Sequence, residues 1–219
     1  VYKDPLRPEV TIQAVPGAKV YYTTDGSAVT TKSTLYKAPF ILGNTGPVKA
    51  MAVKAGLLPS GEVKGDFRVY NLMKAQIVGT TSPGLQFSYY EGENLDIRSV
   101  ETGAALKKGT TSVINESLKQ RKEKYGLLFT GYIRLDKQAM YEFFTTSDDG
   151  SQLFIDDELI VNNDGNHGME EKNGKALLAM GYHKIKVIYF DSGGGNGLKV
   201  HFKAEGGEKK ELAGEMLFQ

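Results

Sequence analysis

Two adjacent carboxylates at the end of an apolar run are the strongest candidates for a binding site in this sequence. Asp148 and Asp149 follow residues 139–147, which read as a strand, and precede Gly150, which permits a tight loop. A second strand pattern follows at 151–155, so we expect the pair to lie at a strand end. The alternative is that Asp148 caps the turn through its own backbone while Asp149 faces solvent.

Two other loops carry groups that recognise sugar hydroxyls through hydrogen bonds. Residues 162–167 place several side-chain oxygens and one imidazole in one loop, and residues 191–197 offer exposed backbone amides in a glycine-rich loop. We expect both to line one pocket with the two aspartates. The predicted carbohydrate-binding residues are Asp148, Asp149, Asn163, Asp164, His167, Gly193, Gly194 and Asn196. The alternative for 162–167 is a turn cluster in which His167 packs locally.

Residues that would support other chemistry are missing or too far apart. The sequence has no cysteine, no serine-nucleophile signature and no evident acid/base pair of carboxylates, so we predict no catalytic residues. The histidines His167, His183 and His201 are too far apart for a zinc motif, and we expect structural roles for them. A second aspartate pair, 156–157, is interpreted as a hairpin turn.

Composition limits the partners and the compartment. Among 219 residues, 27 lysines and arginines nearly balance 26 aspartates and glutamates, so we expect no nucleic-acid partner. The basic run 119–124 contains a glutamate and is expected to be a solvated face. No apolar run approaches the ~20 residues needed to span a bilayer, and no signal peptide opens the chain. Because the sequence begins at Val1 without methionine, we expect a fragment of a longer, exported polypeptide.

Short runs of β-branched and aromatic residues, separated by glycine and proline, predict an all-β chain of two sandwiches. We expect a small sandwich over 1–70, a linker over 71–83 and a larger sandwich over 84–219. In the small sandwich, residues 10–15 and 19–24 are predicted to form a hairpin.

In the larger sandwich, residues 91–124 are predicted to be mostly loop, with a helical turn or two at 117–124. A glycine-led aromatic strand is predicted at 85–90. The remaining strands are predicted at 126–135, 139–147, 151–155, 158–161, 175–180, 183–190 and 198–204.

Residues 8–70 resemble the small fibronectin-type or immunoglobulin-like domain that is appended to chitobiases and β-N-acetylhexosaminidases. The residues that carry the resemblance are Tyr21-Tyr22-Thr23-Thr24-Asp25-Gly26-Ser27, followed by Thr34, Tyr36, Pro39 and Phe40. The family usually has proline at the position of Val29, a departure that affects one turn and leaves the assignment unchanged.

Residues 84–219 resemble the fourteen-kilodalton protective-antigen domain, a β-sandwich of bacterial glycosidases, yeast adhesins and toxins. The matching pattern comprises Gly131-Tyr132-Ile133, Tyr141-Glu142-Phe143, Thr146 to Ser151, Leu153 to Asp156, Asn163-Asp164-Gly165, His167-Gly168 and Gly181 to Val187. In the adhesin branch of that family, two consecutive aspartates joined by a cis peptide bond bind calcium, which takes sugar hydroxyls as ligands. The resemblance therefore implies calcium as a cofactor held by Asp148 and Asp149, in keeping with its preference for hard oxygens.

The pairing of the two domains resembles the C-terminal tail of family-twenty β-N-acetylhexosaminidases, which implies a secreted protein in the bacterial periplasm or at the cell surface. The leading hypothesis is a non-catalytic carbohydrate-binding accessory region. Its partners would be a glycan or terminal sugar and the catalytic domain of the same polypeptide. One alternative is a structural tail that stabilises that catalytic domain and has no ligand. Another is an enzyme, which would need two carboxylates of unequal pKa in one pocket.

Overall fold

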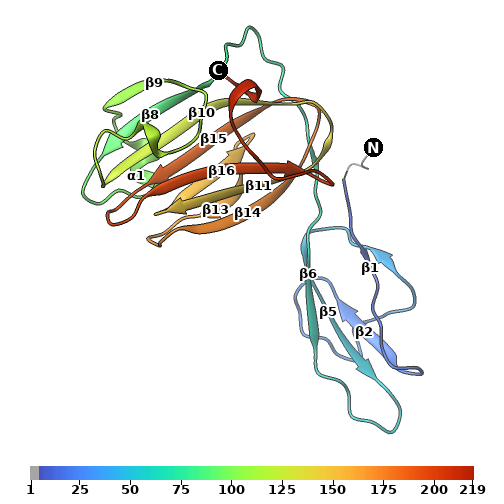
Figure 1. Ribbon diagram of the computed structural model, residues 1–219. Helices are drawn as coiled ribbons and strands as arrows, with labels where there is room; N and C mark the ends of the chain where they lie inside the picture. Colours follow the sequence, from blue (N-terminus) through green and yellow to red (C-terminus); the bar gives the residue numbers. More distant parts are fainter. Residues whose placement is uncertain (1–4) are drawn as a thin grey trace. The chain divides into compact units, whose positions relative to one another are not determined.

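The computed structural model describes residues 5–219, which form two compact units, residues 5–71 and Leu72–Gln219 (Figure 1). Strands make up 49% of the chain and helices 6%, which confirms the all-β prediction. Each unit has a hydrophobic core of its own. Among residues 5–219, no helix combines the length and the apolar character needed to cross a membrane.

The N-terminal unit has a four-stranded sheet of order β3-β2-β5-β6 and a two-stranded sheet of β1 and β4. The bounds are β1 Glu9–Val10, β2 Lys19–Thr23, β3 Thr34–Leu35, β4 Phe40–Ile41, β5 Gly46–Val53 and β6 Val63–Phe67. Val10, Leu42 and Val48 are buried together and come from both sheets or their flanks. The core of this unit therefore lies between the two sheets.

The hairpin predicted from residues 10–15 and 19–24 is wrong. β1 pairs with β4, whereas β2 pairs with β3 and β5, so the two consecutive strands lie in different sheets. The tight turn between them does form, and Gly17 has the positive φ of 79° that such a turn requires. The proline and glycine of the turn indicate where the chain reverses. The pairing of β1 instead goes with the burial of Val10 against Leu42 and Val48.

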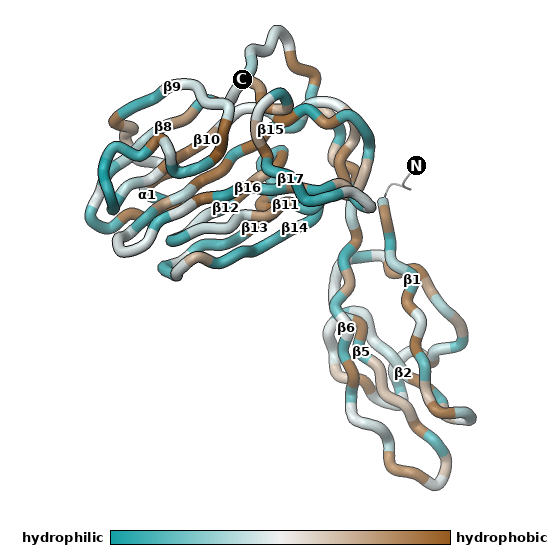
Figure 2. Tube along the Cα trace, viewed as in Figure 1, coloured by the Kyte–Doolittle hydropathy of each residue, from teal (hydrophilic) through white to brown (hydrophobic). Residues whose placement is uncertain are grey.

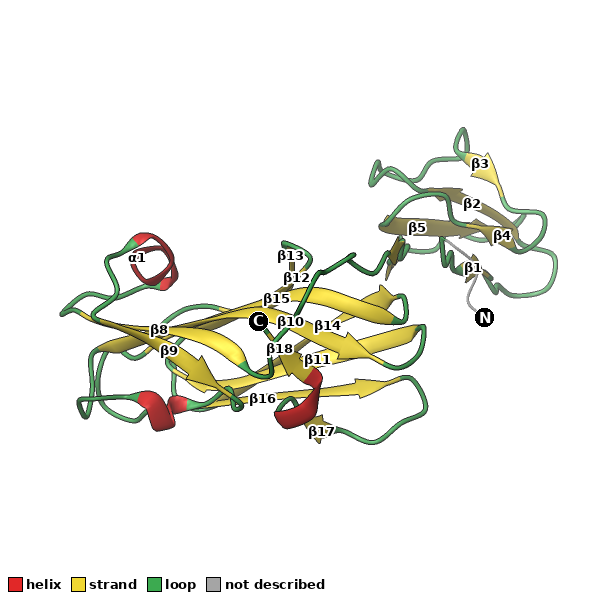
Figure 3. Cartoon of the chain, turned by 90° about the horizontal axis from the view of Figure 1, so that it is seen from above, coloured by secondary structure: helices red, strands yellow, loops and turns green. Residues whose placement is uncertain are grey.

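The C-terminal unit is a sandwich of two sheets, which Figures 1 and 3 show as two layers. One sheet has the order β13-β12-β15-β10-β8-β9, with β18 also paired to β10, and the other has the order β17-β16-β11-β14-β7. All pairs are antiparallel except β14 with β7. The strands are β7 Leu72–Met73, β8 Leu85–Glu91, β9 Lys107–Thr111, β10 Tyr125–Leu135, β11 Ala139–Asp148, β12 Ser151–Ile155, β13 Glu158–Asn163, β14 Glu170–Leu178, β15 Gly181–Phe190, β16 Gly197–Ala204, β17 Lys210–Glu211 and β18 Leu217–Phe218. Every strand predicted between residues 126 and 204 is present.

Alternating side chains fill the space between these sheets. In β10, Tyr125, Leu127, Phe129 and Ile133 occupy odd positions and are fully buried, as a strand with one face in the core requires. Figure 2 shows apolar residues along central strands such as β10 and β15. The packed sheets give the loops at the strand ends a rigid support.

Residues 91–124 contain more regular structure than the predicted loop. Helix α1 spans Ile97–Thr102, and β9 pairs with β8. Asp96 caps the helix by accepting a hydrogen bond from Ser99 N at 2.7 Å, and Ile97 and Val100 are buried. So short a helix shows only one apolar pair, which explains why its periodicity is not recognisable in the sequence. The 3-10 turn η1, Glu116–Leu118, covers only the start of the segment predicted as helical, and η2 spans Gly214–Met216.

The segment 71–83, predicted to be a linker, makes ordered contacts with the C-terminal unit. β7 adds a short parallel strand beside β14. Gln76 N donates to Tyr182 O at 2.8 Å, and Ser82 and Gln219 exchange two backbone hydrogen bonds. At least these parts of the segment belong to the second unit.

The aspartates at 156–157 form the predicted hairpin turn between β12 and β13, and both have positive φ. His183 is fully buried beneath this turn, and its Nδ1 lies 2.7 Å from Asp156 Oδ2. Its Nε2 lies 3.0 Å from the carbonyl of Ala179. His183 therefore has the structural role expected for it.

Candidate functional site

Three loops meet at one end of the C-terminal sandwich because the strands that carry them are neighbours. Asp148 ends β11 and lies opposite Gly197, the first residue of β16. Ser151 begins β12 and lies opposite both Asn163 of β13 and Tyr189 of β15. The aspartate loop, the asparagine-rich loop and the glycine-rich loop therefore project from adjacent strand ends.

Asp149 is the hydrogen-bonded centre of these loops. It is only 5% exposed. Its Oδ1 accepts from His167 N at 3.1 Å, and its Oδ2 accepts from both N and Oγ of Ser192 at 2.8 Å. These donors belong to the other two loops, so one carboxylate connects all three. The alternative in which Asp149 faces solvent is therefore wrong.

Asp148 has a different environment although it is the next residue. Its backbone carbonyl accepts from the hydroxyl of Tyr189 at 2.7 Å, and the peptide bond from Asp148 to Asp149 is cis. Its half-buried carboxylate faces the glycine-rich loop, where a Cβ added to Gly195 would lie 2.5 Å from Oδ2. Within residues 5–219, no hydrogen-bond donor contacts this carboxylate, which is accessible to solvent.

A third carboxylate, Asp191, lies close enough to both aspartates to feel their charge. It is fully buried, and its Oδ2 accepts from Lys124 N at 2.5 Å while its Oδ1 has no partner among the described residues. Burial raises the pKa of Asp191, and the charges of Asp149 and Asp148 raise it further. The sequence placed Asp191 in the glycine-rich loop without indicating this role.

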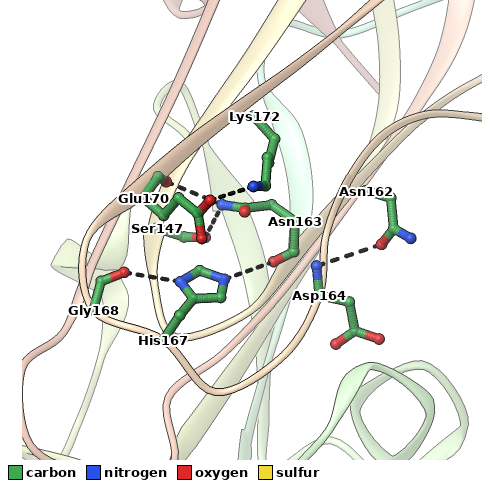
Figure 4. A network of polar contacts seen from close by, with 8 residues as sticks. All are labelled: Ser147, Asn162, Asn163, Asp164, His167, Gly168, Glu170 and Lys172. Carbon is green, nitrogen blue, oxygen red and sulfur yellow. Dashed lines mark hydrogen bonds and ion pairs between the residues drawn. The ribbon is translucent and has the colours of Figure 1, made fainter.

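His167 folds the asparagine-rich loop onto itself (Figure 4). Its Nδ1 lies 2.8 Å from the carbonyl of Gly168 and its Nε2 lies 3.1 Å from the carbonyl of Asn163. Because carbonyls only accept, both ring nitrogens must donate, which favours the imidazolium. Burial by itself would lower the pKa of His167, but these two acceptors and nearby acidic charges raise it overall. This local packing is the structural role considered for His167.

Asn163 lies beneath the same loop and is 2% exposed. Its Nδ2 donates to Ser147 Oγ and to the carbonyl of Glu170, both at 3.0 Å, while its Oδ1 is buried without a partner in the described chain (Figure 4). Asp164 is exposed, and its Oδ1 accepts from Gly165 N at 2.8 Å as part of a turn. The two predicted residues thus differ: Asn163 supports the loop, and Asp164 lies at the surface.

The glycine-rich loop is braced by the basic segment 119–124, which the sequence suggested was a solvated face. Asn196 Oδ1 accepts from Lys119 Nζ at 2.6 Å, and its Nδ2 donates to the carbonyl of Lys122 at 2.9 Å. Gly194, at a φ of 97°, donates from its N to Glu123 Oε2 at 3.2 Å. Lys119, Gln120 and Lys122 are exposed, as expected of a solvated face, but the segment also contacts the loop, which the sequence did not indicate.

Gly193, the remaining predicted residue, has a φ of 121° and lies beside the same segment. A Cβ at this position would lie 3.3 Å from Glu123 Oε2. The glycine thus serves both the backbone conformation and the close approach of the two loops.

Several side-chain oxygen atoms gather at this end of the sandwich. The charges of Asp149 and Asp148 both raise the pKa of Asp191, and two buried side-chain oxygens, those of Asn163 and Asp191, have no partner in the described chain. Within residues 5–219, however, no three His, Cys, Asp or Glu side chains come together as a metal-binding group. An ion held by Asp148 and Asp149 would take its other ligands from carbonyl, amide, water or sugar oxygens, all of which calcium accepts.

Comparison with known families identifies both units. The family model described as PA14 domain matches residues 81–213, more than half of the chain. The chain belongs to the PA14 domain family. A second model, the chitobiase/beta-hexosaminidase C-terminal domain, matches residues 2–64 and confirms the resemblance found in the N-terminal part. No curated protein matches the chain.

Solved structures with similar folds support the PA14 assignment. An anti-sigma factor domain-containing protein covers 99% of this chain and 85% of its own, at 16% identity and a TM-score of 0.55. A PA14 sugar-binding domain from an RTX adhesin covers 59% and 94%, at 18% identity and a TM-score of 0.52. The Epithelial Adhesin 9 A domain from Candida glabrata, in complex with Galb1-3GlcNAc, covers 64% and 90%, at 10% identity and a TM-score of 0.51. At these identities the likeness concerns the fold.

Proposed function

We propose that this chain is a non-catalytic carbohydrate-binding accessory region, and that the loops around Asp148 receive a terminal sugar with the help of calcium. The observation that carries this proposal is the Asp148 carboxylate, which faces the glycine-rich loop and has no donor within residues 5–219. The sugar-binding RTX adhesin domain and the Candida glabrata adhesin share the PA14-type sandwich and give further support.

Different residues would have different roles in such a site. Asp149 and Tyr189 hold the aspartate loop against the glycine-rich loop, and the buried Asn163 supports the adjoining loop from below. Asp148 would provide the free carboxylate, and the exposed side chain of Asp164 would line the rim together with Asn196. Bound calcium would neutralise the clustered carboxylates and offer coordination positions to two neighbouring sugar hydroxyls.

We further propose that the parent polypeptide is a secreted glycoside hydrolase of the β-N-acetylhexosaminidase type, located in the periplasm or at the cell surface. The match of residues 2–64 to the chitobiase/beta-hexosaminidase C-terminal domain supports this proposal. The catalytic domain of that polypeptide would then be the partner of this chain. Catalysis would reside in that domain and not in the two units described above.

One observation favours a second candidate, a structural tail without a ligand. Both carboxylate oxygens of Asp149 already accept hydrogen bonds from the protein. Asp149 is therefore useful to the fold whether or not an ion binds, and the loops would be ordered without one. In this case the two units would serve to stabilise the catalytic domain.

Thermal unfolding distinguishes the two candidates. The midpoint of the C-terminal unit would be measured in chelator, in millimolar calcium, and in calcium with N-acetylglucosamine or galactose. Binding to the native state alone raises the midpoint, so a calcium-dependent rise that one sugar extends supports the proposal. Asp148→Asn should abolish both rises, whereas Asp157→Asn, in the other aspartate pair, should retain them. No rise with saturating calcium and sugar would leave the structural tail as the better account.

A further inference from the structure

One cavity of the C-terminal unit lies at the end of the sandwich opposite the aspartate loop. It has a volume of about 490 Å³ and opens between the β10–β11 turn, the β16–β17 turn and η2. Tyr141, which lines it, precedes Asp148 by seven positions in β11, or about 23 Å along an extended strand. The cavity is therefore separate from the site proposed for calcium and is of the size that small ligands occupy.

The floor of the cavity is apolar and held in place. Tyr141 is 3% exposed, and its hydroxyl donates to the carbonyl of Lys137 at 2.8 Å. Its ring lies 6.4 Å from that of Phe202 with only 30° between the planes. Met216 from η2 and the half-buried Phe202 pack against the core and complete the floor. Tyr141 is too deeply buried to contact a ligand, so the half-buried Phe202 and Met216 provide the apolar surface on which a sugar ring can lie.

The rim of the cavity carries cations without carboxylate partners. Arg134, Lys137 and Lys210 line it, and none of the three forms an ion pair within residues 5–219. Lys203 and Lys209, on nearby strand and turn, do form such pairs, with Glu142 at 2.9 Å and Glu171 at 2.6 Å. The rim cations are thus free to meet an anion, and the planar guanidinium of arginine suits a carboxylate best.

Two acidic side chains complete the lining. Asp136 and Glu208 share the rim with the three cations and offer acceptors for hydroxyl groups. A ligand that matches the whole lining therefore needs one flat apolar face, several hydroxyls and one negative charge. A sugar ring bearing a carboxylate has all three features, whereas a neutral sugar lacks the charge and a simple carboxylate lacks the ring.

We propose that this cavity is a second ligand site, which takes a carboxylate-bearing sugar ring of the hexuronic acid type. The ring lies on Phe202 and Met216, the carboxylate meets Arg134, and Lys210, which lies opposite Phe202 in the β16–β17 pair, adds a second cation. Binding here requires neither calcium nor Asp148. The site therefore goes beyond the proposed function and would give the chain a second point of contact with an acidic glycan.

The test is an NMR titration of the full 219-residue chain in chelator with glucuronate, glucose or acetate. Glucuronate is expected to shift the amides of residues 134–137 and 207–210 in a saturable manner. It should bind about ten-fold more tightly than glucose or acetate, because ring and carboxylate each contribute. If acetate binds as tightly as glucuronate, the cavity binds anions in general without recognising the sugar ring, and the proposal is overturned. Shifts confined to the aspartate loop, or no shifts, would overturn it as well.

Two variants test the assignment of the carboxylate. Arg134→Gln is expected to lower the affinity for glucuronate about ten-fold while leaving the weak binding of glucose unchanged. Lys184→Gln removes a cation that pairs with Asp157 outside the cavity and should bind glucuronate like the original chain. Equal losses in both variants would show a general charge effect and refute the site. Asp148→Asn should leave glucuronate binding intact, so failure of the calcium-dependent function and failure of this proposal are distinguishable.

Discussion

Asp148 and Asp149 are adjacent, but replacing each by asparagine is expected to change stability by very different amounts. In chelator, Asp149→Asn should lower the free energy of unfolding of the C-terminal unit by about 2–4 kcal/mol. The carboxylate accepts three hydrogen bonds while 5% exposed. An asparagine that keeps its oxygen toward Ser192 must direct its amide at His167 N, which is also a donor. The change therefore removes one charge-assisted hydrogen bond, weakens two others and buries an unsatisfied donor.

Asp148→Asn should change the same free energy by no more than about 0.5 kcal/mol, because no protein donor in the described chain contacts this half-buried carboxylate. In saturating calcium, Asp148→Asn should also be less stable than the original chain. The original chain should gain about 2.7 kcal/mol at a hundred times the dissociation constant, and Asp148→Asn should gain nothing.

Urea unfolding followed by the amide signals of β10 measures both effects without a contribution from the N-terminal unit. β10 lies in the core of the C-terminal unit, so its signals report loss of that core. Equal destabilisation by the two substitutions in chelator would refute the division of roles. If Asp149→Asn leaves the free energy of unfolding unchanged, the hydrogen bonds of Asp149 do not hold the loops together.

Three smaller changes test the glycine-rich loop and the contact between Asp156 and His183. Gly195→Ala should displace the Asp148 carboxylate, because the added Cβ would lie 2.5 Å from Oδ2, and should therefore abolish stabilisation by calcium. Gly168→Ala is the control: its Cβ would have nothing within 4 Å, and stabilisation by calcium should be retained. Lys119→Met should speed hydrogen exchange of the glycine-rich loop by removing its 2.6 Å hydrogen bond, whereas Lys122→Met, which removes no described side-chain contact, should not. Hydrogen bonds from a histidine and a backbone amide hold the pKa of Asp156 below 3.8 despite its burial, so Asp156→Asn should destabilise at pH 7 by about 1–2 kcal/mol. In acid titrations of the unfolding free energy, that difference should shrink as pH falls below 3.8 through the lowered pKa, because the native carboxylate then protonates too.

The strands of the larger sandwich are predictable because burial of one face imposes a period of two on the sequence. Tyr125, Leu127 and Phe129 show this alternation and lie where it indicates. Pairing in the small unit is not predictable in the same way, because the turn at Gly17 fits either a hairpin or a crossing between sheets. The choice depends on burial of Val10 against residues more than thirty positions away, which no local pattern encodes.

The candidate site shows the same limit at the level of single residues. The sequence identifies the aspartate pair and the two polar loops, because carboxylates, amides and glycines are concentrated there between strand patterns. It does not reveal that Lys119 and Glu123 brace the glycine-rich loop, because exposed charged residues are ordinary on any surface. The sequence also does not show that Tyr189, one of several buried strand tyrosines, donates a hydrogen bond from its hydroxyl to the carbonyl of Asp148.

The division between the two aspartates follows from chain geometry that a motif does not contain. The donors to Asp149 come from residues 18 and 43 positions away, and their places depend on how β13 and β15 align with β12. Asp148, one residue earlier, points toward a glycine-rich loop that supplies no donor to its carboxylate. The hydrogen bonds of the Asp149 carboxylate are sufficient to hold the three loops together. The Asp148 carboxylate raises the pKa of the buried Asp191 and accepts no hydrogen bond from the described chain, and a bound cation would offset its charge.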